Sequence, residues 1–494
     1  MPISRDFDKP PQSISSETCS NVHQNREKVF MDKQNAVDYV AGLIKRARKA
    51  QAVAENFTQE KVDKLTQALA FAMTREPVKK ELATLALEES ELGDYESKLG
   101  KIEKKVKGIY REIRNEKTVG VVEEFPEKGL RRIAKPVGVI GGLIPSTQPE
   151  MLPMTKALFA IKARNAIVFC PHPRGRKTTF RTTEIMREVL EKNGAPADLL
   201  ICSEEVSLDI TNEVMRQCDL VIATGGAGMV KAAYSSGTPA YGVGAGNACL
   251  VVDDSADLKD AAFKTMLSKT GDLSAGCSCD NSLIIFENVY DKMIQELRAQ
   301  GGYMCSAAER EKVQKAVFPE WPQNHTINRD IVAKPVSVIA KLAGISVPEG
   351  TKFIMVEETG SGHEHPFSGE KMCLVLAVYK CKDIDDGIRI VNANHAYSGA
   401  GHSCGIHSHN QDNILKFALQ TRTTRCNVNL PNSVANTGDW GAGYPFTGSL
   451  GCATWGGNIA SENIVLKHYL NSTWVASPIQ PIIPTDKELF GELM

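Results

Sequence analysis

Short continuous apolar runs, separated by segments with helical character, are the feature that most constrains the fold of this chain. One series lies between residues 137 and 254, and a second lies between residues 282 and 380. Such runs are typical of strands buried on both faces of a parallel sheet, with helices in the crossovers. Because 494 residues also exceed one ordinary core, we predict an α/β chain with two domains in tandem. The runs are VGVIGGLI (137–144), AIVFC (166–170), LLICS (199–203), LVIAT (220–224), CLVVDD (249–254), SLIIF (282–286), FIMVE (353–357) and CLVLAVYK (373–380).

The charge balance argues against two classes of partner. The formal net charge is −1, which gives no electrostatic footprint for nucleic acid or an anionic membrane. No apolar run reaches the roughly 18 residues that a membrane helix needs. Residues 1–30 are polar and lack the apolar core of a signal peptide. We therefore predict a cytoplasmic protein with a disordered N-terminal tail and with no nucleic-acid or membrane partner.

The segment SAGCSCDNS (274–282) places Cys277 and Cys279 two residues apart. A closed zinc site needs four ligands, and no second cysteine pair lies nearby in the sequence. The small neighbours let a substrate approach the sulfur, and the segment lies between the two α/β series, where a cleft is expected. A nucleophilic thiol is therefore the leading hypothesis, with a turn of small residues as the alternative. We predict no metal, although the histidines between His395 and His409 leave a metal protein as a further alternative.

A glycine turn follows the apolar run at 220–224 and opens a predicted helix. Glycines let the backbone approach a ligand, and a helix N-terminus favours anions, so this turn predicts a phosphate or dinucleotide site. The spacing departs from GxGxxG, and a tight turn without a ligand remains an equal alternative. The residues concerned are Thr224, Gly225 and Gly226.

A basic loop, PHPRGRKTT (171–179), follows the run at 166–170. Ligands of open α/β sheets bind at the carboxyl ends of the strands. The loop could therefore contact an anionic group, and a solvated basic loop is the alternative. Its basic side chains are His172, Arg174, Arg176 and Lys177.

Taken together, these segments resemble the CoA-acylating branch of the aldehyde dehydrogenase superfamily, nearest to its sulfoacetaldehyde and succinate semialdehyde members. The match covers about 400 residues in the family's order, which is far more specific than any one motif. The matching segments are LIPSTQP (143–149), KALFAIKARNAIVFCPHPR (156–174), ATGGAGMVKAAYSSGTPAYGVGAGN (223–247), SAGCSCDNS (274–282), GAGHSCGIHS (399–408) and LGCATWGGNIASENI (450–464).

The resemblance implies an aldehyde dehydrogenase-like domain organisation. A Rossmann-like coenzyme domain is expected over 31–246, with an oligomerisation hairpin near 120–136. A catalytic α/β domain is expected over 247–460, and a C-terminal oligomerisation extension over 461–494. The family also implies a homodimer or homotetramer.

The resemblance assigns a role to individual residues. Cys277 falls on the catalytic thiol, and Cys279 on a secondary position. His402 matches a histidine near the active site, and we consider it as the base for CoA or as a residue that orders its loop. Either Thr147 or Gln148 could complete an oxyanion hole with the backbone N–H of Cys277. The expected coenzyme-binding residues are His172, Arg174, Arg176, Thr224, Gly225, Gly226, Gly246 and Glu370, with Glu370 holding the nicotinamide ribose.

Val243 marks the departure from the hydrolytic aldehyde dehydrogenases. It stands where those enzymes carry a glutamate base, and valine cannot activate water. The thioester formed on Cys277 should therefore wait for CoA as the second nucleophile. A hydrolytic enzyme that releases free acid and a non-catalytic scaffold are the rival interpretations.

Arg422 and Arg425 precede a segment that approaches the substrate funnel in relatives. A guanidinium there would suit an aldehyde that ends in a carboxylate or sulfonate, whereas surface arginines are the alternative. Sulfoacetaldehyde and succinate semialdehyde are the leading substrates, and acetaldehyde remains open. The basic residues Arg174 and Arg176 favour NADP⁺ over NAD⁺ through the 2′-phosphate, with NAD⁺ still open.

Overall fold

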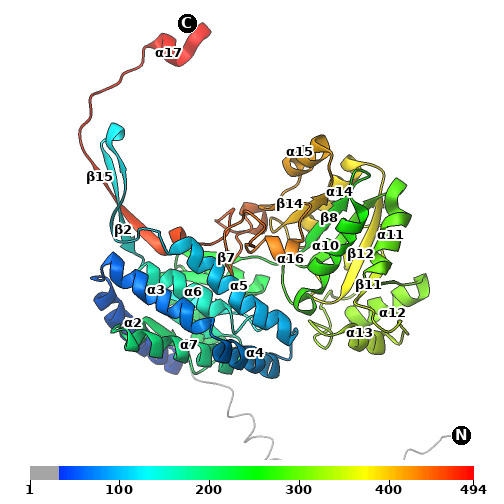
Figure 1. Ribbon diagram of the computed structural model, residues 1–494, viewed down its shortest axis with the longest axis horizontal. Coiled ribbons are helices and arrows are strands. Elements are labelled where there is room, and N and C mark those ends of the chain that lie inside the picture. The colour runs from blue at the N-terminus through cyan, green and yellow to red at the C-terminus, as the bar shows by residue number, and fades with distance from the viewer. Residues whose placement is uncertain (1–32) are drawn as a thin grey trace, which may run out of the picture.

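A computed structural model describes residues 33–494, which form two lobes, each built on a parallel sheet (Figure 1). The first sheet has five strands in the order β5-β4-β3-β6-β7, and every neighbouring pair is parallel. Its strands are buried on both faces, as continuous apolar runs require. They are β3 (Val139–Ile144), β4 (Ala166–Pro171), β5 (Leu200–Cys202), β6 (Leu220–Thr224) and β7 (Ala240–Val243).

Helices cover this first sheet. Some pack directly on the strands and the others pack on those helices, and all of them contribute side chains to one continuous core. The helices of the first lobe are α2 (Lys33–Ala54), α3 (Gln59–Met73), α4 (Glu76–Ser90), α5 (Tyr95–Ile113), α6 (Leu152–Lys162), α7 (Arg176–Lys192), α8 (Leu208–Gln217) and α9 (Ala227–Tyr234).

The second sheet has seven parallel strands in the order β10-β11-β12-β9-β8-β13-β14 and its own core. The chain passes from the first sheet to the second between Val243 and Ala248. The predicted α/β class, with a Rossmann-like domain and a catalytic α/β domain, is confirmed. The strands are β8 (Ala248–Val252), β9 (Asp280–Phe286), β10 (Gly302–Met304), β11 (Phe353–Glu357), β12 (Val375–Cys381), β13 (Cys404–His407) and β14 (Cys426–Val428). The helices are α10 (Leu258–Thr270), α11 (Tyr290–Ala299), α12 (Ala307–Val317), α13 (Val336–Ala343), α14 (Ile384–Tyr397), α15 (Gln411–Gln420) and α16 (Asn432–Ala435).

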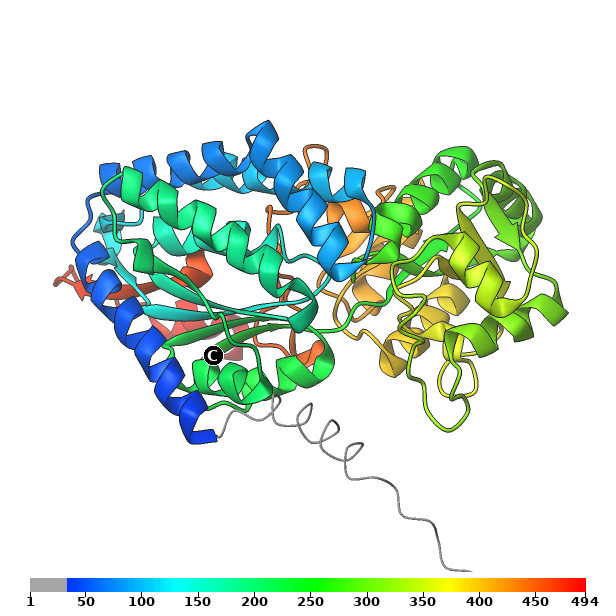
Figure 2. The same ribbon diagram turned by 90° about the horizontal axis from the view of Figure 1, so that it is seen from below.

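The segment after α16 returns to the first lobe. Phe446, Ala460, Ile464 and Tyr469 pack in the first core, so the chain leaves the second lobe before the boundary predicted at residue 460. Seen from below, this segment lies between the two lobes (Figure 2). The two lobes are therefore joined by more than one passage of the chain.

A third, antiparallel sheet projects from the first lobe as an arm (Figure 1). It contains β1 (Gly120–Phe125), β2 (Leu130–Pro136) and β15 (Leu470–Ala476), in the order β1-β2-β15. The hairpin predicted near 120–136 is thus joined by a C-terminal strand. Beyond it, residues 477–494 are exposed and end with α17 (Asp486–Phe490).

Two sequence predictions concern the N-terminal tail and membrane-spanning helices. The predicted disordered tail, 1–30, lies outside the described residues. Between residues 33 and 494, no helix combines the length and the apolar character needed to cross a bilayer.

Candidate active site

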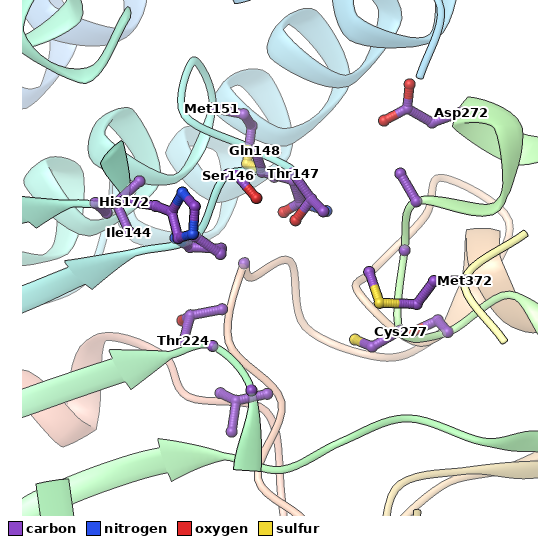
Figure 3. Close-up of a pocket in the computed structure, with 18 of the residues that line it drawn as sticks. Ile144, Ser146, Thr147, Gln148, Met151, His172, Thr224, Asp272, Cys277 and Met372 are labelled. Carbon is purple, nitrogen blue, oxygen red and sulfur yellow. The ribbon is translucent and has the colours of Figure 1, made fainter. Parts of the chain in front are cut away.

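A cavity of about 900 Å³ opens between the two lobes. Its walls come from the carboxyl ends of β3, β4, β6 and β7, from the loop that carries Cys277, and from α5. Figure 3 shows Ser146, Thr147 and Gln148 on one side of the cavity and Cys277 across from them, with His172 and Thr224 at the other end. The cleft predicted between the two α/β series is therefore present, and it contains the candidate thiol.

A tight turn between α10 and β9 places Cys277. Three consecutive residues, Asp272, Leu273 and Ser274, have φ values of 49°, 51° and 67°. Non-glycine residues rarely adopt this left-handed conformation, so the turn stores strain that its surroundings must offset. The buried Asp272 carboxylate supplies this support, since it accepts the N–H of Asp94 (3.0 Å) and pairs with Lys101 Nζ (2.5 Å). The turn before Cys277 is thereby tied to the first turns of α5 in the other lobe.

Replacing Asp272 by Asn should lower the free energy of unfolding by about 3 kcal/mol, because it removes one partner of a buried ion pair. Urea unfolding followed by fluorescence measures this change. Asp385 is the matched control, since it forms an ion pair at the protein surface with Lys416, and Asp385→Asn should cost less than about 1 kcal/mol. Equal unfolding midpoints for the two variants would show that Asp272 does not support the turn.

The thiol of Cys277 contacts His402. Cys277 Sγ lies 3.2 Å from Nε2 of His402. The surrounding protein raises the pKa of the Cys277 thiol to about 12, through burial first and then through the negative charge of Glu370 and the neighbouring cysteines. The resting thiol is therefore protonated at neutral pH and needs a base before it can act as a nucleophile.

His402 is fully buried behind the thiol rather than in the wall of the cavity. Its Nδ1 lies 2.9 Å from Ser403 Oγ, and its backbone oxygen accepts a hydrogen bond from Arg425. Burial, Arg425 and His395 hold the pKa of the imidazole well below its ordinary value. The ring is therefore neutral at physiological pH and is a weak base in the resting site, so Nε2 would take the thiol proton only as the sulfur bonds to the substrate.

Glu370 lines this end of the cavity, and Gly246 packs behind it against the backbone of Cys277. Burial raises the pKa of the Glu370 carboxyl to about 8, and the backbone N–H of Gly246 partly opposes that shift. A Cβ at Gly246 would lie 1.8 Å from the backbone oxygen of Cys277. Gly246 therefore lets the catalytic loop approach this segment closely, and it does not itself line the cavity.

The N-terminus of a helix opens into the other end of the cavity. Thr224, Gly225 and Gly226 line it where β6 leads into α9. Gly226 is the N-cap of α9 and has no side chain to occupy the first N–H groups of the helix. A Cβ at Gly226 would meet nothing within 4 Å, which shows room above this helix end. Free N–H groups at a helix N-terminus favour an anionic ligand.

The basic loop reaches the cavity only in part. His172 lines the cavity, and its Nδ1 accepts the N–H of Arg174. The guanidiniums of Arg174 and Arg176 instead donate to the backbone oxygens of Ser90 and Glu204, respectively. These two arginines are exposed and do not line the cavity.

The two arginines predicted to bind the substrate also lie away from the cavity wall. Arg422 is exposed at the surface. Arg425 is buried, and its guanidinium donates to the backbone oxygens of His402 and Gly451 and to the side chain of Asn463. These hydrogen bonds hold the His402 segment in place, so Arg425 acts here as a structural cation.

Sequence reasoning missed the lysines of α5. Lys101, Lys104 and Lys105 all line the cavity that contains Cys277. Their signal is the buried face of the helix, on which Lys98 and Lys105 alternate with Ile102 and Ile109 at helical spacing. A lysine on the apolar face of a helix is unusual, and it indicates a buried ion pair or a ligand.

Three further observations concern Cys279, the other cysteines and possible metal-binding groups. Cys279 is buried, with its Sγ 3.7 Å from the backbone oxygen of Gly271. The cysteines of residues 33–494 are free thiols. Within the same residues, no group of three or more His, Cys, Asp or Glu side chains could hold a metal ion.

Comparison with known proteins places this fold and site in a family. The profile of the aldehyde dehydrogenase family matches residues 13–319. A sulfoacetaldehyde dehydrogenase of Acholeplasma sp is 40% identical over 92% of this chain and 94% of its own length. The chain therefore belongs to the aldehyde dehydrogenase family.

Two solved structures show which branch of the family the chain resembles. An acetylating aldehyde dehydrogenase from Geobacillus thermoglucosidasius superposes with a TM-score of 0.87 and 35% identity, over 92% of this chain and all (100%) of that one. A Rhodopseudomonas palustris propionaldehyde dehydrogenase, solved with bound CoA and an acylated cysteine, superposes with a TM-score of 0.78 and 25% identity. The match covers 89% of this chain and 97% of that one. The protein is thus an enzyme of the acylating aldehyde dehydrogenase class.

Proposed function

We propose that the protein converts a small anionic aldehyde, CoA and NAD(P)⁺ into an acyl-CoA and NAD(P)H, with Cys277 as the acyl carrier. The observation that carries this proposal is the 3.2 Å contact between a neutral His402, buried behind the cavity wall, and Cys277 Sγ, which lines the same cavity as the glycine turn after β6. The acylated cysteine in the Rhodopseudomonas palustris relative supports it.

The residues of the cavity supply each proton and each bond change. His402 takes the thiol proton as Cys277 Sγ bonds to the aldehyde carbon, which gives a thiohemiacetal. The backbone N–H of Cys277, with Thr147 or Gln148, would stabilise the oxyanion. Thr224, Gly225, Gly226, His172 and Glu370 would hold the nicotinamide coenzyme, which would supply the hydride acceptor.

The second half of the reaction releases the acyl group to CoA. After His402 has released its first proton to solvent, it would accept the proton of the CoA thiol, whose sulfur attacks the thioester carbonyl. The Cys277 sulfur then leaves and takes that proton back from His402. Val243 lines the cavity as a buried aliphatic side chain at the position where hydrolytic relatives carry a glutamate. It offers water no base, and this favours thiolysis over hydrolysis.

Two further features belong to this proposal. The exposed loop with Arg174, Arg176 and Lys177 favours NADP⁺, because its charges follow β4 next to His172, which lines the cavity. To reach a 2′-phosphate, the two guanidiniums would have to leave the backbone oxygens of Ser90 and Glu204. The antiparallel arm and the exposed C-terminal segment favour a homodimer or homotetramer, since they offer an unpaired sheet edge and apolar side chains to a second copy. A polar chain of near-zero net charge suits a cytoplasmic enzyme.

An aldehyde panel tests the proposed substrate class. With CoA and NADP⁺ present, kcat/KM for sulfoacetaldehyde should exceed that for acetaldehyde by at least about 100-fold, the value of one well-placed charged contact. Succinate semialdehyde should fall between the two. Coenzyme reduction at 340 nm measures the rate, and a parallel series without CoA should stop after one turnover. Continuous turnover without CoA would instead indicate a hydrolytic enzyme.

A further inference from the structure

Three lysines of α5 lie in the wall of the substrate cavity, and two of them have carboxylate partners. Lys101 pairs with Asp272, and Lys104 pairs with Asp439. Lys105 differs, because its Nζ donates only to backbone oxygens, those of Thr437 at 2.9 Å and Gly438 at 2.7 Å. Within residues 33–494, no carboxylate lies within 4.0 Å of it.

The environment of Lys105 penalises an unpaired charge. The side chain is 6% exposed, and its Nζ also lies 5.4 Å from the centre of the Phe446 ring. Burial first, and then the charges of Lys104 and Lys101, hold the pKa of the Lys105 ammonium well below its ordinary value, and the more distant carboxylates of Asp439 and Glu112 only partly oppose this shift. A buried cation that lacks a counter-ion is costly, so an anion arriving in the cavity would be stabilised there.

We propose that Lys105 binds the anionic end, a sulfonate or carboxylate, of the aldehyde substrate. This inference rests on the proposed function and names the residue that sets its substrate class. The two backbone oxygens fix Nζ in place and leave one of its three N–H bonds for a ligand. Ser433 and Thr437 line the same part of the cavity. Lys105 thus takes the role that the sequence suggested for Arg422 and Arg425.

Substrate selectivity tests this assignment. In Lys105→Met, the ratio of kcat/KM for sulfoacetaldehyde to that for propanal should fall at least about 30-fold, because only the anion loses a charged partner. Lys107→Met is the matched control, since Lys107 lies two residues further along α5 and its side chain is 53% exposed. Its ratio should stay within about twofold of the wild type.

An inhibition experiment on the unmodified enzyme tests the same anion site without depending on the folding of a variant. Ethanesulfonate should inhibit propanal oxidation competitively with the aldehyde, whereas the uncharged ethanesulfonamide should bind at least about tenfold more weakly. The Lys105→Met enzyme should lose this difference between the two inhibitors.

Each other outcome overturns the assignment. An unchanged selectivity ratio would remove Lys105 from substrate recognition. Equal loss with both aldehydes would make it a structural lysine that holds the Thr437 segment. A raised KM for CoA without a change in the ratio would assign Lys105 to the CoA phosphates. The proposed function fails separately, when the unmodified enzyme shows no CoA-dependent turnover of any aldehyde.

Discussion

Replacing Cys277 by alanine should lower kcat for aldehyde oxidation by at least about 10⁴-fold, since removing a catalytic nucleophile leaves only binding and electrostatic effects. The structure leaves the rest of the cavity intact in this variant, because the turn that carries residue 277 is held by Asp272 and α5. Coenzyme reduction measured under saturating aldehyde and CoA gives the rate, and circular dichroism confirms that the variant is folded.

The neighbouring thiol provides the matched control. Cys279 is buried against the backbone of Gly271 rather than against His402, so Cys279→Ser should keep kcat within about tenfold of the wild type. Mass spectrometry adds a direct test. Protein given aldehyde and oxidised coenzyme without CoA should carry the acyl group on Cys277. An unmodified Cys277 beside accumulating product, or an inactive Cys279→Ser with an active Cys277→Ala, would contradict the assignment.

The sequence predicted the parts of the site that lie in the loops directly after buried strands. The apolar run at 220–224 forms β6, and the glycines after it line the cavity because parallel strands present their carboxyl ends at one edge. The same alternation of runs and helices predicted both sheets and the cleft between them. These features depend on local periodicity and chain direction, which the sequence contains.

The residues that sequence reasoning misplaced depend on distant parts of the chain. Arg425 lies near the predicted funnel in sequence, but Gly451 and Asn463 approach it and occupy its guanidinium. Lys105 makes the converse case, since Thr437 and Gly438 are more than 300 residues away in the chain. Neither contact leaves a periodic signal. The only sequence signal for a role of Lys105 in the site is its position on the apolar face of α5.

Replacing His402 by glutamine should lower the rate of the first coenzyme-reduction burst by about 10²–10⁴-fold, the usual contribution of a positioned general base. Glutamine retains a polar group near Cys277 Sγ but cannot accept its proton. A stopped-flow burst isolates acylation of Cys277, and a second mixing step with CoA then measures thiolysis of the same enzyme. Loss in both steps would show that one histidine serves both thiols.

The pH dependence distinguishes a base from a residue that only orders its loop. Between pH 6.5 and 9, the wild-type burst rate should be nearly flat, because His402 is already neutral and the Cys277 thiol, with its pKa raised to about 12, is still protonated. In His402→Gln, the thiol must ionise by itself, so the burst rate should rise about tenfold per pH unit across that range.

Ser403→Ala is the matched control for this profile. Ser403 Oγ contacts Nδ1 of His402, at 2.9 Å, on the side of the ring away from the thiol-bound Nε2. Its loss should therefore reduce the burst rate by less than about tenfold and leave the pH profile flat. A purely structural His402 predicts a different result, in which both variants lose rate by the same factor at every pH. In that case the proton of Cys277 would have to leave by another route, and Glu370, whose carboxyl has a pKa raised to about 8 by burial and which lines the same cavity, would be the group to test next.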